Sequence, residues 1–165
     1  MTKSPDSMAE VPEGYELCSM PDGAFGSAAG PLFIRRDGSG FAFRVGTKHC
    51  NARNVVHGGM LMTFADQVLG LTIQRAVGSV GVATISLHCD LVSGAVPGEL
   101  IEGEAIVTRI TRSIVFVRGS LRCGDRPVMT ASGLWKRLKP APERASKVTG
   151  SEPASSSRSS SRHAT

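Results

Sequence analysis

Residues 51–70 read N-A-R-N-V-V-H-G-G-M-L-M-T-F-A-D-Q-V-L-G, and this stretch decides the fold of the chain. Apolar side chains recur at three- and four-residue spacing from Leu61 to Ala76, which predicts one amphipathic helix. It is the only long helical pattern in the sequence, and Gly78 supplies a stop at its end. A loop rich in Asn precedes the helix.

Two features of the same stretch point to chemistry. Gly58 and Gly59 at a helix start let a substrate approach backbone N–H groups that have no partner within the helix. One acid, Asp66, borders the apolar face two helical turns later. The stretch therefore encodes a donor site for a developing oxyanion and a candidate base.

The rest of the chain reads mainly as strands. Residues 31–36 and 41–45 flank a D-G-S-G turn and predict a hairpin, whereas residues 15–30 carry only a weak pattern. Four further strands are predicted after the helix, at 82–91, 100–110, 114–123 and 126–136. Residues 82–91 alternate strictly, which predicts one polar face that carries Thr84 and His88.

This order of elements predicts an α+β fold. An antiparallel sheet has one apolar face to bury, and the single helix is the element available to cover it. We expect a sheet wrapped around one central helix, spanning residues 15–138. Residues 1–14 are expected to form a flexible lead-in, and the Ser-, Arg- and Pro-rich residues 139–165 a disordered tail.

The net charge of +5 gives no support to a nucleic-acid-binding fold. The chain has 19 Lys or Arg and 14 Asp or Glu. Residues 136–165 carry seven of the basic and two of the acidic side chains, so residues 1–135 carry twelve of each sign. The basic character belongs to the tail, and we expect no nucleic-acid partner.

Four widely spaced cysteines predict reduced thiols in a cytoplasmic protein. Cys50 and Cys89 each follow a His, but no ligand pair has the short spacing typical of structural zinc, so no metal and no cofactor are expected. The N-terminus lacks an apolar signal region, and no apolar run is long enough to span a membrane.

Five residues and one strand follow in a set order: Asn51, then His57, Gly58 and Gly59, then Asp66, and then a Thr-bearing G-V-A-T-I-S-L strand. This pattern resembles the hotdog-fold thioesterases, and most of all the PaaI-type acyl-CoA thioesterases. The resemblance runs from about residue 15 to residue 138. It implies a five- or six-stranded antiparallel sheet around the helix. It also implies a homodimer or homotetramer whose sheets join edge to edge, with active sites at the dimer interface.

By position, the resemblance implies that Asp66 is the catalytic carboxylate, as general base or nucleophile. The Gly58 N–H would polarise the thioester carbonyl, Asn51 and His57 would orient the thioester and the loop, and Thr84 would help to hold the attacking water. Asn51 and His57 also have purely structural interpretations, as a loop cap and as a helix-start residue. Asn54 stands where the family commonly has Gly, and Asn tolerates the left-handed backbone.

The resemblance predicts an enzyme that hydrolyses a small, medium-chain or aromatic acyl-CoA to free acid and CoA. We expect Gly59, Met62, Val82 and Ala83 to line the substrate site, and Arg109, Arg112 and Ser113 to contact CoA phosphates, although these three also suit a solvated turn. Two alternatives remain: an acyl-thioester hydratase or dehydratase, and a non-catalytic acyl-CoA-binding protein.

Overall fold

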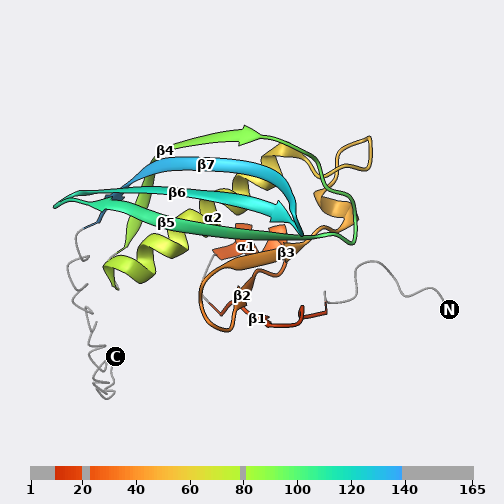
Figure 1. The fold of residues 1–165 in the computed structure, drawn as a ribbon, viewed down its shortest axis with the longest axis horizontal. Helices are drawn as coiled ribbons and strands as arrows, with labels where there is room; N and C mark the ends of the chain where they lie inside the picture. The colour runs from red at the N-terminus through yellow and green to blue at the C-terminus, as the bar shows by residue number, and fades with distance from the viewer. Residues whose placement is uncertain (1–9, 20–22, 79–80, 139–165) are drawn as a thin grey trace, which may run out of the picture.

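The computed structural model describes residues 10–19, 23–78 and 81–138, which form one antiparallel sheet curved around one long helix (Figure 1). The elements are, in chain order, β1 (Tyr15–Leu17), α1 (Gly23–Ala29), β2 (Phe33–Arg35), β3 (Phe41–Arg44), the 3₁₀ turn η1 (Thr47–His49), α2 (Gly58–Val77), β4 (Val82–Leu91), β5 (Leu100–Ile110), β6 (Ile114–Cys123) and β7 (Arg126–Arg137). The predicted tail at 139–165 and residues 1–9 of the predicted lead-in lie outside the described residues.

Helix α2 is confirmed, and it forms the centre of the core. Its apolar stripe is buried because it packs against the inner face of the sheet; the buried members are Leu61, Phe64, Ala65, Val68, Leu69 and Ile73. Each of these side chains larger than alanine stabilises the fold by about 1.5–3 kcal/mol through burial. The helix ends at the predicted stop, where Gly78 has a φ of 79° that a glycine adopts without strain.

Two glycines of the sheet let α2 approach closely. A Cβ on Gly103 of β5 would lie 2.7 Å from a methyl group of Val68, and one on Gly119 of β6 would lie 2.9 Å from a methyl group of Leu69. Side chains at these positions would push the helix away from the sheet. The glycines therefore determine how tightly the sheet closes around α2.

The sheet has seven strands in the order β1-β2-β3-β5-β6-β7-β4, so the expected count of five or six was wrong. The predicted hairpin and the four later strands are confirmed, and the additional strand is β1. β1 pairs with β2 over three residues, and its Tyr15 hydroxyl donates to Glu102 of β5. Such a short strand depends on distant partners, which a local pattern does not contain.

The strict alternation expected for β4 was also wrong. A β-bulge interrupts its pairing with β7 between Thr84 and Ser86. Before the bulge, Thr84 lies opposite the buried Trp135; after it, Cys89 lies opposite the buried Ala131. Thr84 and Cys89 therefore face the helix, whereas His88 faces outward, because the extra residue reverses the alternation.

Candidate active site

The loop before α2 is closed by the side chain of Asn51. Its Oδ1 accepts from the backbone N–H of Arg53 at 2.9 Å and of Val55 at 3.4 Å. Asn54 has a φ of 57°, which is the left-handed conformation. Asn tolerates this conformation better than most residues, so it can stand where the family commonly has Gly. In this structure the Asn51 carboxamide oxygen thus organises its own loop.

His57 caps the start of α2. Its Nδ1 accepts from the N–H of Gly59 at 2.9 Å, and its carbonyl accepts from Met60 and Leu61. A helix start exposes four N–H groups. Here these contacts satisfy those of Gly59 and Met60, and the N–H of His57 donates to the carbonyl of His49 at 2.8 Å. The Gly58 N–H has no acceptor in the described part of the chain, so it is the one helix-start donor available to a ligand.

Asp66 lies in the middle of α2 and is linked to β4. The Thr84 hydroxyl donates to Asp66 Oδ1, with 2.8 Å between the two oxygens. Asp66 is half-buried and Thr84 is exposed, so the pair lies at the boundary between the core and solvent. This contact brings together two residues that the sequence places in the site.

A row of three residues at four-residue spacing runs along α2 beside β4. It consists of Gly58, Met62 and Asp66. At one end of the row, a Cβ on Gly58 would lie 3.0 Å from a methyl group of Leu91, and at the other Asp66 meets Thr84. Met62 is exposed between them. Gly58 and Asp66 are about 12 Å apart along the helix axis, at 1.5 Å per residue.

The other expected substrate residues divide into two groups. Val82 packs against the core at the start of β4, and Ala83 beside it is exposed. Arg109, Arg112 and Ser113 are exposed around the turn between β5 and β6, at the end of the sheet near the C-terminal end of α2 (Figure 1). No contact in the described residues joins this turn to Asp66.

Sequence reasoning missed Cys89 and Leu91 as neighbours of the site, because uninterrupted alternation from Thr84 places both on the opposite face. Burial raises the pKa of the Cys89 thiol, and the nearby Asp66 and Asp90 carboxylates raise it further. A raised pKa keeps this thiol protonated and poorly nucleophilic, so we assign it no chemical role. Cys89 packs against the core from β4, the strand that also carries Thr84.

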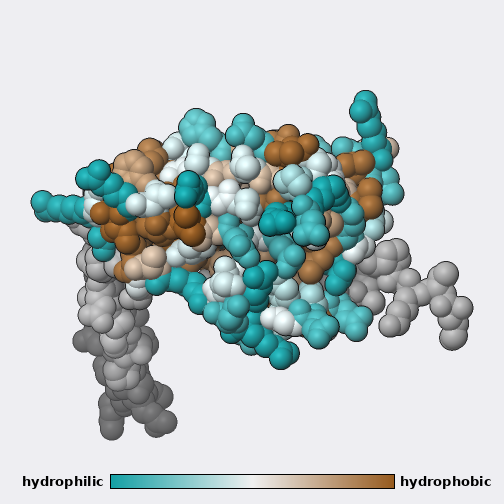
Figure 2. Space-filling model, in the orientation of Figure 1, coloured by the Kyte–Doolittle hydropathy of each residue, from teal (hydrophilic) through white to brown (hydrophobic). Residues whose placement is uncertain are grey.

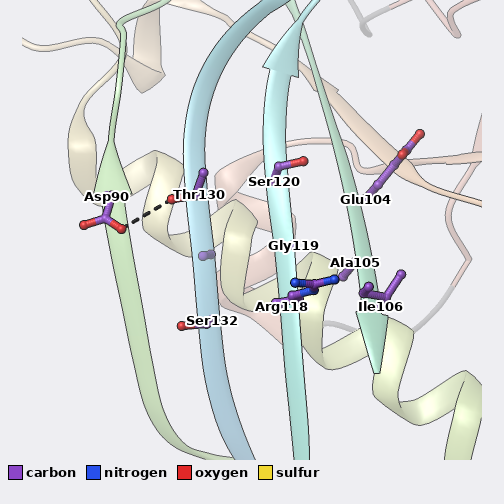
Figure 3. Close-up of a pocket in the computed structure, with 10 residues that line it drawn as sticks. Asp90, Glu104, Ala105, Ile106, Arg118, Gly119, Ser120, Thr130 and Ser132 are labelled. Atoms are coloured by element: carbon purple, nitrogen blue, oxygen red, sulfur yellow. Dashed lines mark hydrogen bonds between the residues drawn. The ribbon is translucent and has the colours of Figure 1, made fainter. Parts of the chain in front are cut away.

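A hollow of about 470 Å³ lies on the other face of the sheet. Figure 3 shows the side chains of Asp90, Arg118 and Glu104 on the surface turned away from α2, where Thr130 donates to Asp90 at 3.3 Å. The sheet separates this hollow from Asp66. It contains none of the predicted site residues, so the candidate active site remains the row along α2.

Apolar side chains are exposed at several places in the described residues, and two of these places lie on the long strands. Figure 2 shows apolar atoms gathered near the turn between β5 and β6, where Ile106, Ile110 and Phe116 are exposed. The second place is the edge of the sheet, where β4 carries exposed Ile85 and Leu91. β4 is ten residues long and is paired on one side only, so its other side offers backbone groups to a further strand.

Within the described ranges, no group of three or more His, Cys, Asp or Glu side chains could hold a metal ion, and the four cysteines are free. No helix in these ranges combines the length and the apolar character needed to cross a membrane.

Comparisons with known proteins identify relatives of this arrangement. The model of the thioesterase superfamily matches residues 53–130. A Pseudomonas aeruginosa protein, provisionally named an esterase, is 31% identical over 133 residues, which cover 78% of this chain and 98% of that protein.

Solved structures share the fold at lower identity. A hypothetical thioesterase of Streptococcus pneumoniae, solved with coenzyme A, matches with a TM-score of 0.58 and 18% identity, covering 78% of this chain and 92% of that one. The PaaI protein from the phenylacetic acid degradation operon of E. coli matches with a TM-score of 0.58 and 15% identity, covering 72% and 86%.

Proposed function

The chain belongs to the thioesterase superfamily and is a thioester hydrolase with the hotdog fold, and from this premise we propose that it hydrolyses acyl-CoA thioesters to a free acid and CoA. CoA is the proposed carrier because the Streptococcus pneumoniae structure of the same fold was solved with coenzyme A. The proposed acyl group is small, medium-chain or aromatic, in contact with the flexible Met62.

The observation that carries the proposal is the hydrogen bond from Thr84 to Asp66. It engages Oδ1 and holds the carboxylate toward β4, so Oδ2 can accept a proton from water. The Thr84 oxygen keeps its lone pairs and can accept a hydrogen bond from the same water. The pair thus supplies what general-base hydrolysis of an electrophilic thioester needs.

In the proposed reaction, water transfers a proton to Asp66 as its oxygen bonds to the carbonyl carbon. The carbonyl oxygen gains negative charge and accepts from the Gly58 N–H, which has no competing acceptor in the described residues. The intermediate then breaks its C–S bond, and the CoA thiolate takes the proton from Asp66. Direct attack by Asp66, with hydrolysis of the resulting anhydride, uses the same groups.

We propose that each active site uses two chains. A thioester with a bound water spans less than about 9 Å between a donor and a base, whereas Gly58 and Asp66 of one chain are about 12 Å apart along α2. A homodimer joined through the β4 edges would bring Gly58 of one chain to Asp66 of the other. The exposed Ile85 and Leu91 suit burial in such a contact.

Arg109, Arg112 and Ser113 are the proposed contacts for the CoA phosphates. Two guanidinium groups and a hydroxyl are suitable donors to phosphate oxygens. The turn makes no contact with Asp66 in the described residues, which suits this role because the pantetheine arm of CoA separates the thioester from the phosphates. Asn51 and His57 are proposed to position the loop and the Gly58 N–H rather than to react.

The test is hydrolysis of a panel of short, medium-chain, long and aromatic acyl-CoAs, measured by the thiol that is released. Asp66→Asn should reduce kcat by about 10²–10⁴-fold, the usual contribution of a general base. The matched control is Asp90→Asn, which removes the same charge on the outer face of the sheet.

Binding of a non-hydrolysable thioether analogue to the Asp66→Asn protein, measured by calorimetry, separates chemistry from binding. We expect binding to be retained. Thioester hydrolysis that survives Asp66→Asn would contradict the assigned base, and an unmodified protein that binds CoA esters without turnover would favour the non-catalytic binding protein.

A further inference from the structure

The segment between β4 and β5 supports the loop that leads into α2. The N–H of Val56 donates to the carbonyl of Ala95 at 2.8 Å, and both residues are buried. Gly94 lies so close to this loop that a Cβ there would be 2.6 Å from a methyl group of Val55. The two segments fit without space between them, so a shift of residues 93–99 would move the loop.

Arg126, at the start of β7, holds this supporting segment in place. Its guanidinium donates to Glu99 Oε1 at 2.7 Å, to Ser93 Oγ at 3.2 Å and to the carbonyl of Gly94. Glu99 in turn accepts from the N–H of Val96 at 2.8 Å. One side chain therefore contacts both ends of the segment whose centre receives Val56.

The contacts continue from this segment to the helix start. Val56 precedes His57, whose N–H donates to the carbonyl of His49 at 2.8 Å and whose ring caps α2. The position of the Val56 peptide therefore sets the direction of the peptide that carries the Gly58 N–H, two residues further along the chain.

We propose that Arg126 is a positioning residue for catalysis: it fixes residues 93–99, which hold Val56 and so aim the Gly58 N–H at the substrate carbonyl. This inference rests on the proposed function, since it assigns a support to the proposed oxyanion donor. A guanidinium suits the role because its planar set of donors reaches three oxygens at once, which a Lys ammonium on a single stem does not reproduce.

The test compares Arg126→Ala with the unmodified protein on the best acyl-CoA of the panel. A displaced oxyanion donor weakens the transition state more than the bound substrate, so kcat should fall about 10–100-fold while KM changes less than about threefold. The matched control is Arg122→Ala, because Arg122 pairs only with the exposed Asp125, at 3.6 Å, in the described residues. It should retain the kcat of the unmodified protein.

Two further measurements separate positioning from general stability. Added guanidinium at millimolar concentration should restore part of the kcat of Arg126→Ala, whereas urea at the same concentration should not. Arg126→Lys should recover less than half of the lost activity, because it cannot make all three contacts. If the alanine variant does not fold, Glu99→Gln tests the same ion pair with a side chain of equal length, and kcat should again fall with KM retained.

A folded Arg126→Ala or Glu99→Gln protein with unchanged kcat would overturn the inference, as would a loss confined to KM. These outcomes differ from failure of the proposed function, in which the unmodified protein itself shows no thioester hydrolysis.

Discussion

The Thr84 hydroxyl of β4 donates to the Asp66 carboxylate of α2, with 2.8 Å between Oγ1 and Oδ1, and this contact depends on a β-bulge. Without the extra residue between Thr84 and Ser86, a strand that turns Cys89 toward the helix would turn Thr84 outward. The bulge therefore allows one strand to present both a hydroxyl to Asp66 and apolar side chains to the core.

Thr84→Val should reduce kcat about tenfold. Valine has the shape of threonine but lacks the O–H, so Asp66 loses a donor to its charged form, a contribution of about 1.5 kcal/mol. Thr84→Ser retains the hydroxyl and serves as the control, with a kcat close to that of the unmodified protein. Steady-state thiol release measures both variants. Equal activity of the valine variant would show that the contact does not act in catalysis.

His57→Leu and His57→Asn distinguish a helix cap from a reacting group. Leucine removes the acceptor for the Gly59 N–H, so the free energy of unfolding should fall by about 1 kcal/mol and kcat should fall as the helix start loosens. Asparagine caps helices well and should retain both stability and most of the activity.

Urea unfolding and thiol release measure the two His57 variants. A stable His57→Asn protein that has lost its turnover would instead assign His57 a direct part in the chemistry.

The fold was predictable because its signals are local. The spacing of apolar residues from Leu61 onward predicts α2, and the turn residues that separate the strands predict the hairpin and the four-stranded part of the sheet. β1 was not predictable, because it has three residues and depends on Tyr15 reaching Glu102 and Arg35 far along the chain.

The site was predictable only in part. The sequence indicates Gly58, Asp66 and Thr84, and the structure joins Asp66 to Thr84. The sequence does not indicate the bulge, because no Gly or Pro marks residues 84–86. The alternation of polar and apolar residues in this strand appears regular. Nor could the sequence predict the proposed role of Arg126. Its partners lie 27 to 33 residues away, and that role depends on how they hold the backbone of residues 93–99.

Stability should decrease in acid through Glu99. The Val96 N–H and the Arg126 guanidinium lower the pKa of this carboxyl below its ordinary value of 4.5. Its stabilising contribution is therefore present above the unfolded-state pKa and is lost as the pH falls through the lower folded-state value.

Glu99→Gln should reduce the difference between the urea midpoints measured at about pH 7 and about pH 3.5. Asp125→Asn, which removes a charge at an exposed turn, is the control and should leave that difference unchanged. An equal acid dependence in Glu99→Gln and the unmodified protein would show that Glu99 is not its source.

The two-chain site predicts complementation between two inactive variants. Gly58→Pro deletes the proposed donor, and proline fits the first position of a helix. His57 already has the extended conformation required before proline, with φ −67° and ψ 135°. Gly58→Ala is the control, because it adds a Cβ near Leu91 but keeps the N–H. Gly58→Pro should lose about 10²–10³-fold in kcat, and Gly58→Ala should retain most of it.

Gly58→Pro and Asp66→Asn are then mixed in equal amounts, unfolded and refolded together. Half of the dimers should combine the two variants, and each of these has one site with an intact Gly58 from one chain and an intact Asp66 from the other. The mixture should therefore recover about a quarter of the activity of the unmodified protein. Activity no higher than that of the separate variants, with mixed dimers confirmed by mass spectrometry, would place both groups of each site in a single chain.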